Sequence, residues 1–301
     1  MRTRSSRPSR SARWGLGAAA LAAAVPLTIL PSTAYADAAD VFGWLETELA
    51  DNGNAMPSPF GGSDWGLTLD AVLALTLGGS DPDPVVDAAM DNVAANIDAY
   101  ITGEAFGDTG STYAGATGKA LLTAILHSDD PNSFGGEDLE ARSRDIMLTD
   151  GVDEGRFADV STFGDFSNGL GQAFNMMGLA LTDDGVPGAA ADFLLAQQCP
   201  GGGFRLTYDA APKTRDCIDD GQAHNDATSF ALQALLSIED VPGASDAIAA
   251  GTAWLLAEQD ATTGGFSESP ATDAVNANSS GLAAQALRAV GETGAADAAR
   301  P

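Results

Sequence analysis

Two short polar segments hold residues whose types and spacing suit contact with a ligand. The first is His224-Asn225-Asp226, and the second, one repeat later, is Asn276-Ala277-Asn278. Each comes directly before a run of small and apolar residues that predicts a helix. Two roles are open. Asp226 and Asn278 suit N-caps, because such side chains accept a hydrogen bond from a first-turn N–H. The segments are also candidates for ligand contact, and we favour capping over contact.

Aromatic residues hold comparable places before earlier predicted helices, namely Trp65, Tyr113 and Phe166. They suit either an apolar rim or simple packing. The candidate ligand-binding residues of the sequence are therefore His224, Asn225, Asp226, Asn276, Asn278, Trp65 and Tyr113. No residue is assigned a catalytic role.

The chain begins with a segment typical of a secretory signal peptide. Five arginines without an acidic residue precede an apolar run from Trp14 to Leu30, and Ala34-Tyr35-Ala36 follows as a cleavage pattern. We expect residues 1–36 to be removed, which leaves residues 37–301 as one secreted, extracellular domain. Association with a cell wall is left open, and no later stretch is apolar enough to cross a membrane.

Only two cysteines occur in the chain, Cys199 and Cys217. In an exported protein a pair so close in sequence predicts a disulfide. It would close a loop of about twenty residues and stabilise the fold by roughly 3 kcal/mol.

The predicted mature chain is strongly acidic. All 42 acidic residues but only nine of the 14 basic ones follow residue 36, so its net charge is about −33. Nucleic acids and anionic membranes are unsuitable partners for such a surface. Solubility outside the cell is the simpler reason for the charge.

Internal repeats decide the expected architecture. Segments 193–198 and 254–259 match at a spacing of 61, and each precedes a Gly-Gly-Phe turn, at 202–204 and 264–266. Each turn then leads to a helix of small residues. Weaker copies extend back to residue 39, so five helical hairpins with a period of about fifty residues are expected. The outer helices should span 39–50, 84–101, 136–148, 187–198 and 245–259.

The end of the chain resembles another outer helix, because Gly294-Ala295-Ala296-Asp297 echoes residues 188–192. We interpret it as the start of a sixth hairpin in an incomplete ring, and the chain as truncated at its C-terminus. A merely disordered end is the alternative.

The segment from Gln198 to Phe204 resembles the QW motif of terpene cyclases, with a longer copy at 259–266. The chain is therefore similar to the prenyltransferase and squalene-cyclase repeat superfamily, which also holds cobalamin carriers and the complement thioester domain. The resemblance implies an all-α fold, an α/α toroid of helical hairpins around a central cavity. It also implies that Gln198, Phe204, Gln259 and Phe266 are structural.

The chemistries of that superfamily match this chain poorly. The Asp-x-Asp-Asp acid of the cyclases is absent, since Asp216-Cys217-Ile218-Asp219-Asp220 has the wrong spacing, and aromatic residues are few. The thioester motif is absent after Cys199. The zinc set of prenyltransferases could be supplied by Cys217, Asp219 or Asp220, and His224, but we favour the disulfide.

We therefore expect no cofactor, with zinc as a minor alternative, and a non-catalytic binder of a small apolar or cobalamin-like ligand or of a cell-surface partner. A diverged cyclase or prenyltransferase-like enzyme is the second hypothesis. A glycan-processing α/α barrel, which needs a paired acid and base, is the third.

Overall fold

The chain is mostly helical, which confirms the all-α class. The computed structural model describes residues 36–79, 83–208, 214–272 and 274–299, and these form twelve α-helices and one two-stranded sheet. Residues 1–35, which hold almost all of the expected signal peptide, lie outside the described ranges. Among the described residues, no helix has the length and hydropathy needed to span a bilayer.

The helices follow one another as five pairs, each with an outer and an inner member. The outer helices are α2 (Ala36–Asp51), α4 (Pro84–Ala95) with α5 (Ile97–Ile101), α7 (Leu139–Asp145), α9 (Gly188–Ala196) and α11 (Ala244–Glu258). The inner helices are α3 (Trp65–Gly78), α6 (Ala114–Leu126), α8 (Gly169–Ala180), α10 (Asn225–Leu236) and α12 (Ala277–Ala289). A last helix, α13 (Thr293–Ala298), packs against α12.

Short elements occupy some of the connections. Strand β1 (Met56–Pro57) pairs antiparallel with β2 (Ser63–Asp64), and Met56 lies opposite Asp64. Two 3₁₀ turns, η3 (Glu104–Phe106) and η4 (Asp220–Gln222), lie in the loops before α6 and α10.

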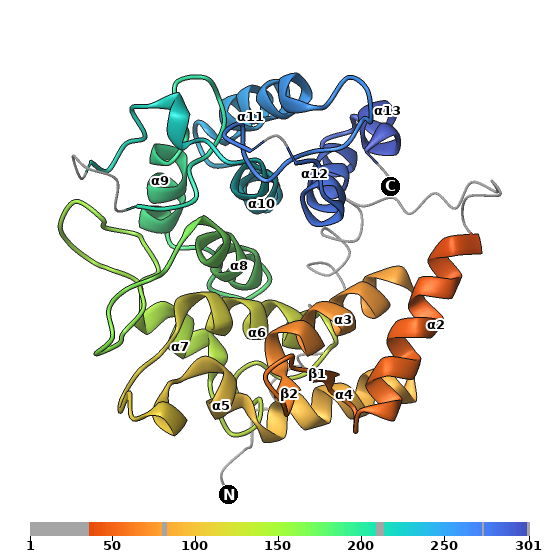
Figure 1. Cartoon of the computed structure of the whole chain (residues 1–301). Helices are drawn as coiled ribbons and strands as arrows, with labels where there is room; N and C mark the ends of the chain where they lie inside the picture. Colours follow the sequence, from red (N-terminus) through yellow and green to blue (C-terminus); the bar gives the residue numbers. More distant parts are fainter. Residues whose placement is uncertain (1–35, 80–82, 209–213, 273, 300–301) are drawn as a thin grey trace, which may run out of the picture.

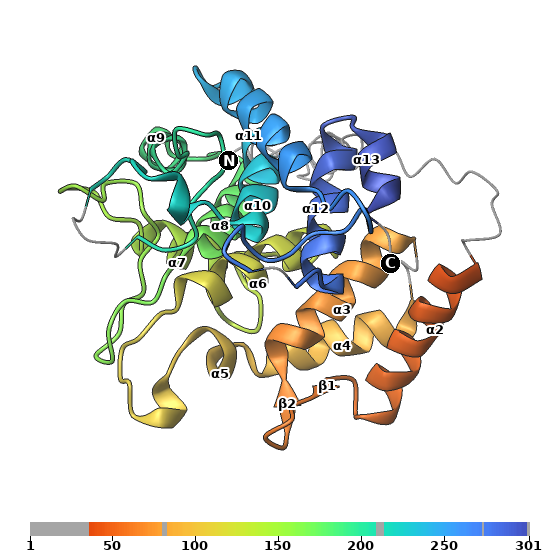
Figure 2. The ribbon, with the colours of Figure 1, turned by 45° about the horizontal axis from the view of Figure 1, so that its top comes forward.

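The inner helices contact one another in chain order, α3 to α6 to α8 to α10 to α12. The ribbon therefore bends into an arc, with the outer helices on its convex side (Figures 1 and 2). The expected outer and inner helices occur in the expected order. Each of the inner helices α6, α8, α10 and α12 packs mainly against the outer helix that follows it, however, and not against the one that precedes it.

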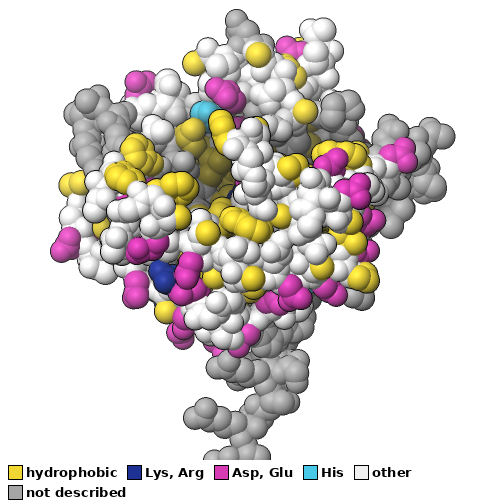
Figure 3. All heavy atoms as spheres, turned by 60° about the horizontal axis from the view of Figure 1, so that its bottom comes forward, with side chains coloured by type: hydrophobic (Ala, Val, Ile, Leu, Met, Phe, Trp, Pro, Cys, Tyr) yellow, Lys and Arg dark blue, Asp and Glu magenta, His cyan; other side chains and the backbone are white. Residues whose placement is uncertain are grey.

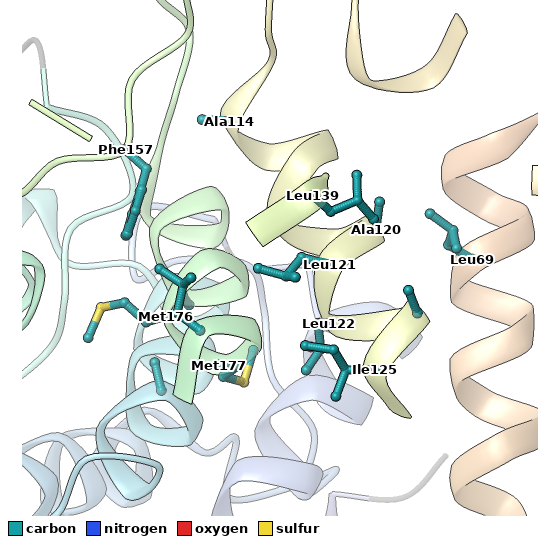
Figure 4. Packing of buried hydrophobic residues seen from close by; sticks show 14 of the residues in the cluster. Leu69, Ala114, Ala120, Leu121, Leu122, Ile125, Leu139, Phe157, Met176 and Met177 are labelled. Carbon is teal, nitrogen blue, oxygen red and sulfur yellow. The ribbon is translucent and has the colours of Figure 1, made fainter. Parts of the chain in front are cut away.

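Small residues bring the central helices α6 and α8 close together. A Cβ at Gly118 would lie 2.6 Å from atoms of Asn175, and one at Gly171 would lie 3.1 Å from the Gly115 Cα. Leu121 and Leu122 of α6 lie beside Met176 and Met177 of α8 in the largest core cluster (Figure 4). All four side chains are at most 5% exposed. Glycine at these positions therefore allows a dense apolar contact between the two helices.

Two expected helix boundaries are wrong. The outer helix predicted at 84–101 is broken at Asn96, whose amide Nδ2 donates to the Asn92 carbonyl oxygen. Gly135 packs tightly against the Ala94 carbonyl and Ile97 at this break. The helix predicted at 136–148 is shorter and starts after Asp138, which accepts from the Ala141 N–H at 2.9 Å.

Glutamine side chains tie each Gly-Gly-Phe turn to the next outer helix. The Gln198 amide donates to the carbonyls of Gly202 and Ala247, both at 2.8 Å. Gln259 repeats this arrangement one hairpin later, with Gly264 at 2.7 Å and Ala295 at 2.9 Å. The structural role expected for Gln198 and Gln259 is thus visible as matched bridges that satisfy carbonyls outside the regular helix ladders.

An earlier hairpin obtains the same bridge from a different part of the chain. The turn around Gly155 lacks the outer-helix glutamine, and Gln172 of inner helix α8 replaces it. Its amide donates to the carbonyls of Gly155 at 3.0 Å and Ala190 at 3.4 Å. The sequence repeat is therefore weaker at this hairpin than the structural repeat.

The fourth residue of an inner helix fixes the turn that precedes the helix. The hydroxyls of Thr68, Thr228 and Ser280 accept the backbone N–H of Met56, Phe204 and Phe266 at 2.8 to 2.9 Å. In α8 the fourth residue is Gln172, whose Oε1 accepts from the Phe157 N–H at 3.0 Å. Four of the five inner helices thus start at one register relative to their turns.

The glutamine bridges give a stability prediction. Gln198→Ala should lower the free energy of unfolding by about 1–3 kcal/mol, because two carbonyls lose their donor. Gln285→Ala is the matched control, since Gln285 lies exposed on α12. Denaturant unfolding of both variants measures the difference. Equal midpoints for the two variants would contradict a role of the bridge in stability.

Candidate functional site

The inner helices share one stripe of less buried side chains. Most of their residues are buried, but the second and sixth residues of each helix are half-buried or exposed. These two positions are one turn apart and lie on the same face of a helix. They are Gly66, Gly115, Leu170, Asp226 and Asn278 at the second position, and Asp70, Lys119, Phe174, Phe230 and Leu282 at the sixth.

This stripe is the concave wall of the arc. The fourth residue points to the preceding turn, and the second and sixth residues lie about 160–200° away from it around the helix. Figure 3 shows one face of the molecule hollowed, with hydrophobic side chains gathered around the hollow. The ten residues at these two positions are called the concave wall.

Side chains at the sixth position contact one another along the wall. Lys119 Nζ lies 2.7 Å from Asp70 Oδ1 and 5.5 Å from the centre of the Phe174 ring. The Phe174 and Phe230 rings pack 4.9 Å apart. The wall thus holds one ion pair, one cation–π contact and one aromatic pair in sequence.

The start of α10 holds a cluster of buried polar atoms without partners. Among the described residues, His224 Nδ1, Asn225 Oδ1 and Asp226 Oδ1 have no hydrogen-bond partner, although each atom is buried. Asn225 itself is 0% exposed. Buried polar atoms are almost always paired, so three unpaired atoms on consecutive residues are unusual.

Burial changes the ionisation of this cluster. Desolvation raises the pKa of Asp226, and a hydrogen bond from Ser279 and the nearby His224 oppose part of that rise. Desolvation also lowers the pKa of His224, against the attraction of Asp226 and Glu268. Burial therefore favours the neutral form of both side chains, and each partly offsets this for the other through the attraction between them.

The predicted caps of α10 and α12 are wrong by two residues. α10 starts at Asn225 with His224 as its N-cap, and the His224 side chain makes no capping bond. α12 starts at Ala277, and its cap Asn276 accepts from the Ser279 N–H at 2.9 Å. Asp226 and Asn278 are therefore second residues of their helices and belong to the concave wall.

The structure brings together only some of the candidate binding residues. His224, Asn225 and Asp226 adjoin the start of α12, because the Asn225 N–H donates to the Glu268 carbonyl and Ser279 reaches Asp226. Asn276 and Asn278 lie at that same helix start.

The aromatic candidates belong to other hairpins. Trp65 begins α3 and packs against the core, and Tyr113 is the N-cap of α6. Phe166 is 75% exposed in the loop before α8.

Sequence reasoning missed the polar centre that holds Tyr113. Asp108 is 0% exposed and accepts from Ser161 Oγ at 2.7 Å and from the Thr162 N–H and Oγ1 at 2.8 and 2.6 Å. Tyr113 donates to it as well, at 3.2 Å. These bonds join two loops that are more than fifty residues apart in sequence. A local sequence pattern therefore cannot predict that the loops meet.

The disulfide between Cys199 and Cys217 is confirmed, with Cα atoms 4.6 Å apart. Its sulfurs are bonded to each other, which argues against the thiolate of the alternative zinc set. The two aspartates of that set form hydrogen bonds within the loop region instead. Asp219 accepts from the Gly221 N–H, and Asp220 accepts from the Gly201 N–H.

A separate pocket of about 210 Å³ lies away from the concave wall, between α4 and the 129–135 loop. Asp91, Asp129 and Asp130 contribute to its lining. An acidic lining alone does not define a ligand, so we assign none to it.

Comparison with known proteins does not place the chain in a family. No family model matches it, and no curated protein matches it. The concave wall and the start of α10 are therefore the features of the molecule that bear on its function.

The Asp108 centre gives a pH prediction. Hydrogen bonds from Thr162 and Ser161 lower the pKa of Asp108 to about 2. A lowered pKa stabilises the fold above the unfolded value of about 3.9, and this stabilisation is lost as pH falls through about 2. Asp108→Asn should lower the Tm at neutral pH, and its difference from the unmodified protein should shrink below about pH 4.

Thermal unfolding monitored by circular dichroism at several pH values measures this effect. The exposed Asp184 provides the control variant, Asp184→Asn. A Tm difference for Asp108→Asn that stays constant down to about pH 2 would show that the charge of Asp108 is not what ties the loops.

The disulfide gives a further prediction. The double variant Cys199→Ser, Cys217→Ser should unfold with a free energy lower by about 3 kcal/mol, because the open loop gains entropy in the unfolded chain. Denaturant titration measures this change. Alkylation of unfolded, unreduced protein should label neither cysteine, and labelling of both would contradict the bond.

Proposed function

We propose that the chain is a secreted, non-catalytic binding protein whose concave wall forms the ligand site of an α/α toroid. The observation that carries the proposal is the trio of buried, unpaired polar atoms on His224, Asn225 and Asp226. Leaving such atoms unpaired costs about 1–3 kcal/mol each. Asp226 is half-buried on the concave wall, so a ligand that donates to its carboxylate would recover part of that free energy on binding.

The wall next to this trio supports the same function. Phe174, Phe230 and Leu282 offer half-buried apolar surface on three successive helices. Ligand sites generally combine apolar lining with a few convergent polar groups. The apolar band and the polar start of α10 supply both parts on neighbouring elements.

The toroid and its superfamily are part of the proposal. Support comes from the serial contacts of the inner helices and from the matched Gln198 and Gln259 bridges. The cobalamin-like or apolar ligand, the cell-surface partner and the extracellular location remain proposals. Catalysis as a cyclase or prenyltransferase has no comparable support, since fold resemblance alone does not establish chemistry.

Native mass spectrometry of the secreted protein tests this function. It should show a retained small molecule in the unmodified chain. Asp226→Ala, His224→Ala and Asn278→Ala should each lower the retained fraction, with a loss of affinity of about tenfold for Asp226→Ala. Asp246→Ala is the matched control, because Asp246 lies in the first turn of outer helix α11.

Two results would overturn the proposal. One is turnover of an isoprenoid diphosphate or a polyene that is lost on removal of one acid, which would make the protein an enzyme. The other is a retained molecule that Asp226→Ala and Asp246→Ala hold equally well.

A further inference from the structure

We propose that the ligand of the concave wall carries an organic ammonium group, which lies between the Asp226 carboxylate and the Phe230 ring. This inference rests on the proposed function, because it assigns the ligand class of that same site. Asp226 and Phe230 are four residues apart on α10 and therefore share one face of the helix. Both side chains are half-buried, and both lie on the side of α10 opposite Thr228, which faces the preceding turn.

The unpaired atoms at the site call for a donor. Asn225 Oδ1 and Asp226 Oδ1 are acceptors, and the Asn225 amide already donates to the Ser267 carbonyl at 2.8 Å. Asn225 is fully buried, so the ligand contact falls on the half-buried Asp226. Because a carboxylate only accepts, the ligand group at Asp226 brings N–H or O–H. A primary ammonium group brings three donors on one atom.

The charges around the site favour a cation over a neutral donor. Asp226 and Glu268 are the acidic groups there, and His224 is the only basic one acting on Asp226 among the described residues. The lysine of the wall, Lys119, is paired with Asp70. An anionic ligand would meet repulsion from both acids, whereas a cation would be attracted.

The aromatic part of the wall suits the same ligand. The Phe174 ring already has the Lys119 ammonium 5.5 Å from its centre, so the wall holds one cation over a phenylalanine. Phe230 packs against Phe174 at 4.9 Å and is the next ring along the arc. A second ammonium group at Phe230 would add a cation–π attraction to the pairing with Asp226.

Three probes of similar size and different charge test the assignment on the whole mature chain. They are 2-phenylethylammonium, neutral 2-phenylethanol and anionic 3-phenylpropanoate. Ligand-observed NMR titration at neutral pH should give a dissociation constant for the ammonium that is at least about tenfold lower than for the alcohol. The carboxylate should bind more weakly than either.

Variants locate the binding. Asp226→Asn keeps the size of the side chain and should weaken ammonium binding by about tenfold, while Phe230→Leu should weaken it by about threefold to fivefold. The controls are Asp246→Asn on outer helix α11 and Phe60→Leu, whose ring is 96% exposed in the β1–β2 turn. Both controls should keep the affinity of the unmodified chain.

The pH dependence supplies a readout that does not depend on how the variants fold. Ammonium binding should weaken as pH falls from neutrality, because protonation of Asp226 removes the negative charge and protonation of His224 adds a positive one. Burial raises the pKa of Asp226, so this loss should begin at a higher pH than for an ordinary aspartate. Binding of the alcohol should change less over the same range.

The outcomes separate this inference from the proposed function. Tighter binding of the alcohol or of the carboxylate than of the ammonium, or an Asp226→Asn variant that binds the ammonium normally, overturns the ammonium assignment. If a retained neutral molecule is then lost in Asp226→Ala, the proposed function still holds. If the unmodified protein neither retains a molecule nor binds any of the three probes, both fail.

Discussion

The hydrogen bond between a turn N–H and the fourth residue of the next inner helix is the constraint on which the rest of the structure depends. Thr68, Gln172, Thr228 and Ser280 accept this bond in four of the five hairpins. An α-helix turns about 100° per residue, so fixing one position fixes the direction of every other one. With the fourth residue facing its turn, the second and sixth residues must face the concave side. A change of register by one residue would move Asp226 and Phe230 off the wall.

The exception among the five hairpins supports this view. The fourth residue of α6 is Thr117, and its buried hydroxyl has no partner among the described residues. Here the loop before the helix is fixed by Asp108, which joins it to Ser161 and Thr162 of the next hairpin. The Tyr113 N–H still donates to the Ile101 carbonyl, as the His224 N–H does to Phe204. Different side chains therefore hold α6 at the register that its neighbours reach through their turns.

The sequence predicted the elements better than the contacts between them. The five hairpins followed from repeated Gly-Gly-Phe turns and small-residue helices, and the disulfide followed from two nearby cysteines, because both signals are local. The break at Asn96 lies against Gly135 from the next hairpin, and the Asp108 centre joins loops far apart in sequence. The Gln172 bridge comes from an inner helix instead of the outer one. In such cases the hydrogen-bonded geometry is kept, but a residue at a different sequence position forms it. A search for repeated sequence motifs therefore misses it.

The sequence predicted Asp226 as the N-cap of α10, two residues after the true N-cap His224, and this error has the largest consequence for function. As an N-cap, the Asp226 carboxylate would accept hydrogen bonds from first-turn N–H groups, and these bonds would explain its burial. As the second residue of the helix it gains from the positive end of the helix dipole but leaves Oδ1 unpaired. Asn225 beside it is fully buried and leaves its oxygen unpaired too. Ser279 bonds Asp226 and the Asn225 amide bonds Ser267, but neither unpaired oxygen has a partner among the described residues, and Asp226 shares a helix face with Phe230 on the wall. A carboxylate oxygen without a partner beside an aromatic ring suits a donor-rich cation from outside the chain, because such a cation would pair with the carboxylate and be attracted to the ring at the same time.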